Sequence, residues 1–379
     1  MNDAPCDRCR ASSDAGHAYC TKCGRPVTAQ AADAAPCEQC RISSDAGNAY
    51  CTKCGKPLAV SAPRPEPPKK DNMRKAISIV GLIILAGCTA MLVFELYAVF
   101  WGMEGIWTGM ENYRLGVLFL TPFPVILFYM SGIVAKFYYL FLVAAVVVSF
   151  VMLMYNSREG IARAFKGKLD KLDEMPLYGV VTMFAMYISI NMILVLLVTS
   201  AGYDPAGLED PEEEWMLWYA LLNASVWEEI LCRVLLIGLP LMIAGLILNE
   251  SGSWKRLFGH SEMNKLAVFL IIFSAAIFAF GHLDGWDLFK VVPTFVCGLA
   301  LGYLFVRYGL YASIMLHFLI DYMSSVTWIF GSSTGADEII TTAELMLVLF
   351  ALSMVVLGIP FIVRYAKRGL NCVRKMFLP

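Results

Sequence analysis

Nine apolar stretches, each long enough to cross a lipid bilayer, follow one another along most of the chain. About twenty consecutive apolar residues suffice for an α-helix to cross the hydrocarbon layer. The pattern predicts an all-α polytopic membrane protein with about eight or nine transmembrane helices. The stretches lie near residues 76–101, 116–134, 136–155, 177–200, 216–248, 266–283, 288–306, 310–330 and 344–365.

Charged residues between the later stretches alternate in sign. Segments 204–214 and 337–343 are acidic, whereas segment 255–265 and the tail from Arg364 to Lys375 are basic. Loops rich in lysine and arginine stay on the cytoplasmic side of a membrane. We therefore expect an integral protein of the cell membrane with a cytoplasmic C-terminus.

The first half of the membrane region fits this rule less well. Three full crossings between residues 76 and 155 would place the basic segment 158–171 outside if the N-terminus is inside. The Thr-Pro-Phe-Pro sequence at 121–124 marks a break where a helix can be re-entrant or tilted. One of the three stretches need not cross fully, and the sequence leaves this parity open.

Composition agrees with a membrane protein and excludes a soluble enzyme. The 379 residues are 58% hydrophobic and 16% charged, with a mean hydropathy of +0.63. The formal net charge of -1 gives no reason to expect a nucleic-acid partner. The first residues lack a basic segment followed by an apolar one, so we expect the N-terminus to be retained rather than cleaved as a signal peptide.

The first sixty residues contain a tandem repeat of paired cysteines. Two Cys-x-x-Cys pairs joined by a short hairpin provide the four thiolates that a structural Zn²⁺ prefers, and reduced zinc thiolates imply the cytoplasmic face. Disulfides or redox-active thiols are the alternatives. We expect two zinc ribbons, 1–28 and 29–58, each with one structural Zn²⁺. The ligands are Cys6, Cys9, Cys20 and Cys23, and Cys37, Cys40, Cys51 and Cys54.

Modules of this size have too few apolar residues for a core, so zinc would supply most of their folding free energy. Their balanced charges show no basic face for nucleic acid, whereas a docking role for a protein partner is plausible. A linker rich in proline and lysine follows at 59–75. We divide the remainder into N-terminal membrane helices at 76–156, a core at 177–331, and a C-terminal membrane helix with a basic tail at 344–379.

Three short polar clusters interrupt the apolar stretches. An ionisable side chain near the bilayer centre costs about 2.5–3.5 kcal/mol on insertion scales and usually faces a partner or a watery cavity. Two imidazoles and several carboxylates in such places can transfer protons or bind a metal. The clusters are Glu228-Glu229 with Arg233, Phe278 with His282, and His317 with Asp321.

Helical spacing separates the two adjacent glutamates. Glu229 and Arg233 are four residues apart and can form an ion pair. This pair could serve only to hold helices together, or it could take part in the function. Glu228 lies about 100° around an α-helix from Glu229 and is therefore the freer base. His317 and Asp321 also share one helical face, and Phe278 can wall the side that His282 occupies.

The ordered motifs EExxxR, FxxxH and HxxxD, each in its own apolar stretch, resemble the CPBP (Abi) family of intramembrane proteases. This family includes the type II CAAX prenyl endopeptidases and bacteriocin-processing or self-immunity proteins. The resemblance covers roughly residues 177–331 and leaves the ribbons as an N-terminal addition. It implies an intramembrane endopeptidase.

The resemblance also implies roles for the motif residues. Glu228 would activate water for attack on a peptide carbonyl, and His282 and His317 would orient that water or stabilise the oxyanion. Asp321 stands where prenyl endopeptidases often have asparagine, and a carboxylate is a better metal ligand but a poorer oxyanion donor. Supporting residues would be Glu229, Arg233 and Phe278.

The sequence leaves the mechanism and the functional class open. Either Glu228 and the histidines hold the water without a metal, which we favour, or a Zn²⁺ is bound among Glu228, His282, His317 and Asp321. Prenylated proteins and leader peptides are both possible substrates. A non-catalytic membrane scaffold or immunity protein that recruits partners through the ribbons is the main alternative, and a proton-coupled transporter is a weaker one.

Overall fold

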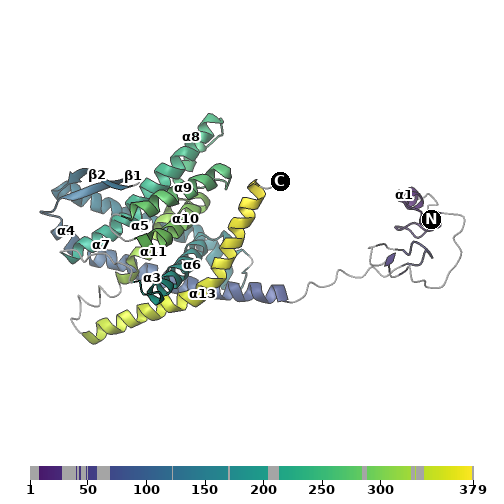
Figure 1. The fold of residues 1–379 in the computed structure, drawn as a ribbon, viewed down its shortest axis with the longest axis horizontal. Helices are drawn as coiled ribbons and strands as arrows, with labels where there is room; N and C mark the ends of the chain where they lie inside the picture. Colours follow the sequence, from purple (N-terminus) through teal and green to yellow (C-terminus); the bar gives the residue numbers. More distant parts are fainter. Residues whose placement is uncertain are drawn as a thin grey trace. The chain divides into compact units, whose positions relative to one another are not determined.

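The computed structural model divides the chain into two compact units, Met1–Met73 and Arg74–Pro379 (Figure 1). Each unit is described by itself below. The structure describes residues 8–27, 40, 42–43, 48, 50–57, 69–121, 123–169, 171–203, 213–283, 288–325, 329 and 337–377.

The first unit contains the two cysteine repeats, which pack against each other reciprocally. The ring of Tyr19 lies against Gly55, and the ring of Tyr50 lies against Gly24. Both glycines have φ near +70°, and a Cβ atom at either would approach the opposing ring to 2.4 Å or less. The aromatic residue and the glycine of each repeat thus form the contact between the repeats.

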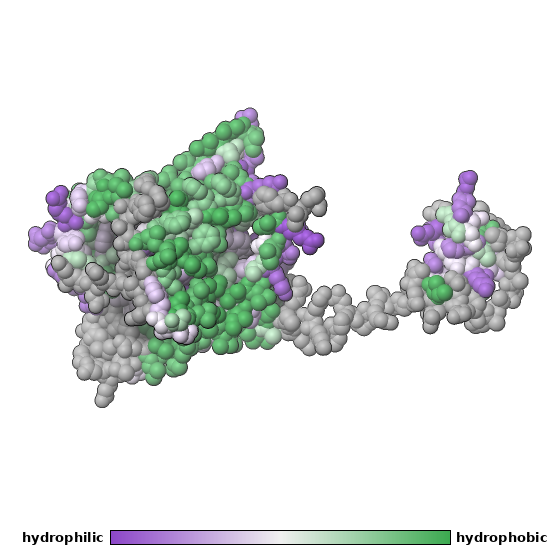
Figure 2. Space-filling model, viewed as in Figure 1, coloured by the Kyte–Doolittle hydropathy of each residue, from purple (hydrophilic) through white to green (hydrophobic). Residues whose placement is uncertain are grey.

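The second unit is a helical bundle, and the prediction of a polytopic all-α membrane protein is confirmed. Figure 2 shows apolar residues over much of the visible face of this unit. Within the described residues, six helical segments are long and apolar enough to cross a membrane. They are Ala76–Trp101, Gly132–Phe165, Pro176–Ser200, Glu214–Ile247, Leu288–Tyr308 and Leu345–Lys375.

The elements of this unit follow the predicted apolar stretches closely, with one exception described below. The short helix α4 (Met103–Gly109) follows α3, and α9 is apolar but shorter than the six segments above. The main helices are α3 (Lys69–Trp101), α5 (Gly132–Phe165), α6 (Pro176–Ser200), α7 (Glu214–Asn223), α8 (Leu239–Ile247), α9 (Lys265–Gly281), α10 (Val291–Tyr308), α11 (Leu310–Asp321) and α13 (Asp337–Phe377).

The predicted stretch near 116–134 forms a β-hairpin instead of a helix. Strands β1 (Leu115–Thr121) and β2 (Phe123–Met130) pair antiparallel. Pro122 and Pro124 lack an N–H donor, and their rings would clash with the preceding turn of a helix. Within the described residues, only two helices of spanning length, α3 and α5, therefore lie before the end of the basic segment 158–171. Two crossings return the chain to the side on which it started, so this segment no longer conflicts with a cytoplasmic N-terminus.

Basic residues from distant parts of the chain meet at one end of the bundle. Asp173, in the turn between α5 and α6, forms ion pairs with Arg364 and Arg368 of α13. Its carbonyl accepts hydrogen bonds from Arg307 at 3.2 Å and from the Tyr308 hydroxyl at 2.9 Å. The structure thus gathers the end of α10, the basic part of α13 and the start of α6 on one side of the membrane unit.

Helix α11 lies in the middle of this bundle and is almost entirely buried. Every residue from Tyr311 to Phe318 is less than 9% exposed, His317 included. The helix packs against α5, α6 and α10. Its length of twelve residues is short for a crossing, and its enclosure by longer helices keeps its polar side chains away from lipid.

Candidate active site

The EExxxR motif lies in a widened part of the segment Glu214–Ile247. Residues Ala224–Glu228 and Ile230–Gly238 form π-helix instead of the α-helix that the spacing argument assumed. Short π-helical insertions occur frequently at functional sites. The run ends two residues before Pro240, whose ring cannot pack against the carbonyl of a preceding α-helical turn.

Glu229 is the anchor of a fully buried ion pair. Its Oε2 lies 3.2 Å from Arg233 Nε, and both side chains are 0% exposed. Ser313 of α11 donates a hydrogen bond to the same carboxylate oxygen, and Oε1 accepts from His317 Nδ1 at 3.0 Å. Glu229 therefore joins the π-helical segment to α11 and sets the orientation of His317.

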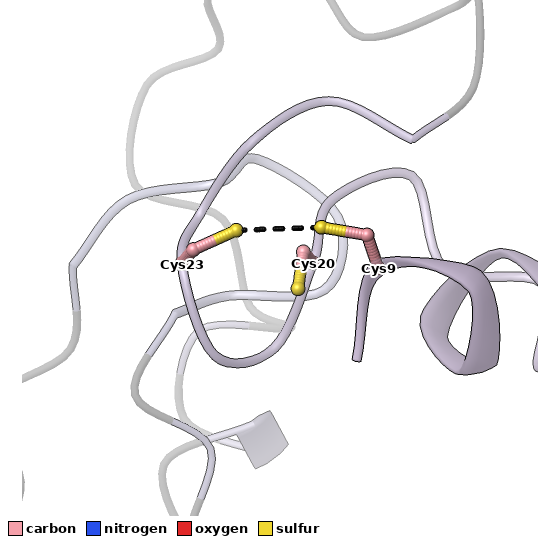
Figure 3. A group of neighbouring side chains, drawn as sticks. All are labelled: Cys9, Cys20 and Cys23. Atoms are coloured by element: carbon pink, nitrogen blue, oxygen red, sulfur yellow. Dashed lines mark hydrogen bonds between the residues drawn. The ribbon is translucent and has the colours of Figure 1, made fainter. Parts of the chain in front are cut away.

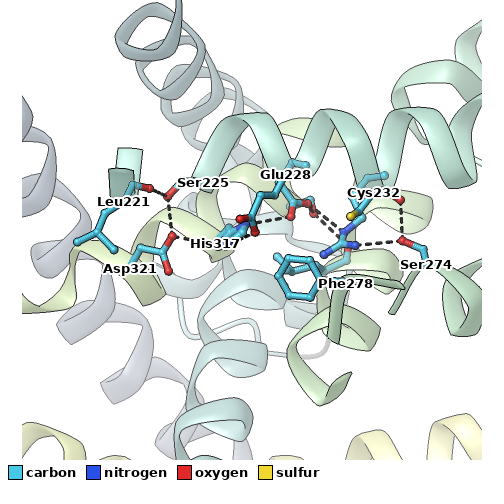
Figure 4. Close-up of polar contacts among 12 residues, drawn as sticks. Leu221, Ser225, Glu228, Cys232, Ser274, Phe278, His317 and Asp321 are labelled. Carbon is cyan, nitrogen blue, oxygen red and sulfur yellow. Dashed lines mark hydrogen bonds and ion pairs between the residues drawn. The ribbon is translucent and has the colours of Figure 1, made fainter. Parts of the chain in front are cut away.

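Arg233 is fixed from the other side by α9. One of its terminal nitrogens donates to Ser274 Oγ at 3.1 Å, and Ser274 in turn donates to the Cys232 carbonyl at 2.6 Å. The guanidinium also lies 4.7 Å from the centre of the Phe278 ring, a cation–π contact that gains strength when water is excluded. The Phe278 ring also contacts both histidines edge-on, with its centroid 4.8 Å from that of His282 and 5.7 Å from that of His317. Figure 4 shows Phe278 beside this polar group.

Both imidazoles direct Nε2 toward Glu228. His282 Nδ1 lies 2.8 Å from the Phe278 carbonyl, which can only accept a hydrogen bond, so we assign a proton to this nitrogen. By the same argument, the Glu229 carboxylate places a proton on His317 Nδ1. His282 Nε2 lies 4.0 Å and His317 Nε2 lies 3.9 Å from Glu228 Oε2. That oxygen has no hydrogen-bond partner among the described residues.

Asp321 completes the group on α11. Its Oδ2 lies 3.4 Å from His317 Nε2 and 3.1 Å from the hydroxyl of Ser225, which also lies 2.8 Å from the Leu221 carbonyl. Asp321 is thus positioned from both sides, by its own helix and by the π-helical segment. Figure 4 shows Glu228, His317 and Asp321 beside one another.

Residues 211–323 match the family model described as "Type II CAAX prenyl endopeptidase Rce1-like". This segment is an Rce1-like domain. The match includes all seven predicted motif residues and supports a CAAX-type intramembrane protease. No curated protein and no solved structure matches the chain.

The distances between Glu228 and the two histidines leave room for one water. Two polar atoms 4 Å apart can share one water at normal hydrogen-bond distances of about 2.8 Å. Such a water would donate to Glu228 Oε2 and contact one or both Nε2 atoms. The Glu228 side chain is 24% exposed, whereas that of Glu229 is 0% exposed, so Glu228 is the more accessible of the two glutamates.

The same atoms do not form a preassembled metal site. Among the described residues, the only groups of three or more His, Cys, Asp or Glu ligand atoms within 4.8 Å of one another are two cysteine clusters. The Rce1-like domain contributes none of these groups. A set of three ligands for a catalytic Zn²⁺ is therefore not preassembled among the described residues, and we derive no step through a metal.

The two cysteine clusters lie in the first unit, outside the Rce1-like domain. They are Cys9, Cys20 and Cys23 (Figure 3), and Cys40, Cys51 and Cys54. The predicted fourth ligands, Cys6 and Cys37, lie outside the described residues. Each set fits a structural Zn²⁺ in its number of thiols and in its spacing.

Sulfur distances support zinc over disulfides. The Sγ atoms of Cys9 and Cys23 lie 3.6 Å apart, and those of Cys40 and Cys54 lie 3.4 Å apart. A disulfide requires about 2.05 Å, whereas two thiolates on one tetrahedral Zn²⁺ are separated by about 3.8 Å. Burial raises the pKa of the Cys51 thiol, but hydrogen bonds from the backbone of Cys54 and Lys53 outweigh it and lower the pKa to about 6.

We expect the full-length protein to carry two Zn²⁺ ions per chain and the double variant Cys51→Ser/Cys54→Ser to carry one, because each ribbon holds its own ion. Elemental analysis of the purified protein measures this. Chelation should remove both ions and leave the helix content of the membrane unit unchanged. A third equivalent that disappears in His317→Ala would instead demonstrate a catalytic metal.

Several residues that position the site were not predicted from sequence. Ser313 precedes His317 by four residues and Ser225 precedes Glu228 by three, so helical spacing places each near a motif residue, although their hydrogen bonds go to Glu229 and Asp321 on other segments. Ser274 similarly precedes Phe278 by four. Serines are common in apolar helices, however, and their sequence spacing alone gives no reason to single out these three.

Proposed function

We propose that this chain is an intramembrane endopeptidase in which Glu228 activates water for attack on a peptide bond. The observation that carries the proposal is the approach of both imidazole Nε2 atoms to Glu228 Oε2, at 3.9 and 4.0 Å. The family match supports the same reaction class. The buried set of Glu229, Arg233 and Ser313 serves to hold this geometry.

The reaction needs one base that later acts as an acid. Glu228 takes a proton from the bound water as the water oxygen forms a bond to the carbonyl carbon. The resulting tetrahedral oxyanion would face His282 and His317. Because their Nδ1 atoms already carry a proton, either imidazole donates from Nε2 to the oxyanion when it enters the reaction as a doubly protonated imidazolium. The C–N bond then breaks, and Glu228 returns its proton to the leaving amine.

We propose a prenylated protein with a C-terminal CAAX-type sequence as the substrate class, following the family description. A leader peptide is the other candidate. A comparison of all protein termini in cells that express the wild type or Glu228→Gln at equal membrane levels distinguishes them. New termini near prenylated C-termini support the proposal, and new termini after leader segments redirect it. If no terminus depends on Glu228, the non-catalytic scaffold becomes the better explanation.

We further propose that the ribbons and the C-terminal tail are cytoplasmic. The basic ends of α5 and α13 lie on the side of the bundle where Asp173 binds Arg364 and Arg368, and basic ends favour the cytoplasm. Fluorescent-protein fusions after Lys168 and after Lys375 should fluoresce, whereas alkaline phosphatase should be active only when fused near Glu213. Phosphatase activity at Lys168 would contradict this orientation.

A further inference from the structure

The β1–β2 hairpin is the only β-sheet that the structure describes, and its residues precede the Rce1-like domain (Figure 1). Because the sheet has two strands, each strand has one edge that the other does not cover. Within the described residues, no backbone hydrogen bond joins either strand to another element. An uncovered strand edge of this kind is a template for pairing with a further strand.

The surface of this hairpin is apolar and largely uncovered. The consecutive residues Val125 to Tyr129 of β2 are each between 45% and 55% exposed. On β1, Leu115 and Val117 are buried in the helical bundle, whereas Leu118 is 41% exposed. Lipid chains can cover apolar side chains, but they offer no partner to the N–H and C=O groups of an open edge. The edge therefore needs a partner that has backbone hydrogen-bonding groups of its own.

One edge of the hairpin faces the EExxxR segment. The indole N–H of Trp227 donates to the Leu118 carbonyl at 2.6 Å, and Trp227 directly precedes Glu228. Along an antiparallel strand, successive residues direct their N–H and C=O groups alternately to the partner strand and away from it. Since Leu118 binds Trp227, it belongs to the set that points away from β2, and Gly116 shares its edge. Both strands also pack against α9, which ends beside His282.

An extended peptide fits this edge by its backbone. Its N–H and C=O groups would pair with those of Gly116 and Leu118, which is the way in which peptides add to an exposed sheet edge. The Leu118 carbonyl has two lone pairs, so it can accept a second hydrogen bond while Trp227 keeps the first. Neighbouring strands lie about 4.8 Å apart, and a strand added to β1 would therefore lie beside the segment that carries Glu228.

We propose that the edge of β1 that faces the EExxxR segment binds the substrate, which adds an extended segment to the hairpin as a third strand and so reaches Glu228. The inference rests on the proposed function, because it assigns the backbone of the peptide substrate as the occupant of the edge. Pairing of this edge with a second copy of the chain would contradict it.

Single amide-to-ester replacements in a peptide substrate test strand pairing without altering the protein. The probe is a prenylated CAAX peptide with an upstream segment, or the substrate that terminus analysis identifies. An ester lacks the N–H donor but keeps the extended shape. Replacement at every second upstream residue should raise KM about two- to tenfold with kcat within about twofold, and the residues between should tolerate it. Equal effects at all positions, or no effect at any, would overturn the proposal.

Photo-cross-linking gives a readout that requires no cleavage. In full-length protein that carries Glu228→Gln, a photoreactive phenylalanine analogue in place of Leu118 should form an adduct with the same peptide, and excess unlabelled peptide should suppress this adduct. The matched control has the analogue in place of Val348, which is 53% exposed on α13, and should give no adduct with the peptide. Equal adducts at both positions, or an adduct between two copies of the chain instead of with the peptide, would overturn the proposal.

The two tests separate this inference from the proposed function. If proteolysis proves independent of Glu228 while the Leu118 adduct forms and is suppressed as expected, the proposed function fails and the peptide-binding edge stands. If cleavage requires Glu228 but the ester scan shows no alternation and Leu118 forms no adduct, the proposed function stands and the peptide-binding edge fails.

Discussion

Glu228→Gln should lower the rate of peptide hydrolysis by about 10²- to 10⁴-fold, the usual contribution of a general base. Glutamine keeps the size of the side chain and can still hydrogen-bond, but it cannot accept the proton of the attacking water. Glu228 Oε2 makes no hydrogen bond to the described residues, so the fold should be unaffected. Turnover of a prenylated CAAX peptide, or of the substrate that terminus analysis identifies, measures the effect.

The appropriate control is Glu214→Gln, the same chemical change at the start of the same membrane segment. Glu214 lies outside the group formed by Glu228, His282, His317 and Asp321, and its replacement should leave turnover within about twofold of the wild type, as at most surface sites. Equal unfolding temperatures of the two variants would exclude a folding defect. Retention of more than a tenth of the activity in Glu228→Gln would remove Glu228 from the mechanism.

Arg233→Met should destabilise the membrane unit by about 3–5 kcal/mol, because it leaves the Glu229 carboxylate buried without its cationic partner. Both side chains are 0% exposed, and the guanidinium also binds Ser274 and covers Phe278. Methionine preserves most of the volume, so the loss reports chiefly on charge. Unfolding of the purified protein in mixed micelles with increasing denaturant measures the free energy.

Two comparisons make this prediction specific. Glu229→Gln combined with Arg233→Met should be less destabilising than Arg233→Met alone, because the double change removes both charges of the pair. Arg368→Met breaks an ion pair with Asp173 in which the arginine is 41% exposed, and such pairs contribute about 0–1 kcal/mol. Equal destabilisation by Arg233→Met and Arg368→Met would show that burial of the Glu229–Arg233 pair is unimportant.

We therefore expect Glu229 to have a structural role that differs from the role of Glu228, although the two residues are adjacent in sequence. Its two carboxylate oxygens are occupied by Arg233, Ser313 and His317, so it holds partners and is poorly placed to accept a further proton. We expect the Arg233 variants to reduce activity as well, through the orientation of His317. This loss should accompany the loss of stability, whereas that of Glu228→Gln should not.

The class of protein and the positions of its motifs could be predicted from the sequence alone. Long apolar runs can satisfy their backbone hydrogen bonds in a membrane only as helices or closed barrels, and local spacing placed Glu229 with Arg233 and His317 with Asp321. Cysteine spacing likewise predicted two clusters of thiols. These inferences rest on contacts within a few residues along the chain, where helix and loop geometry determines proximity.

Two features at the scale of single elements needed the structure. The apolar stretch near 116–134 has the composition of a membrane helix, yet most of its described residues form the β1–β2 hairpin, where the Leu118 carbonyl accepts a hydrogen bond from Trp227 at 2.6 Å. The EExxxR motif lies in π-helix rather than α-helix. Neither follows from hydropathy, because strand pairing and helix widening depend on neighbours far away in sequence.

Tertiary packing alone decided which polar groups meet. Glu228 precedes His282 by 54 residues and His317 by 89, yet the fold brings its Oε2 to within 4.0 Å of both Nε2 atoms. The sequence determined that ionisable side chains lie within membrane segments, where they need polar partners or have a functional role. The partners depend on how the helices pack, since contacts between distant segments leave no local pattern in the chain.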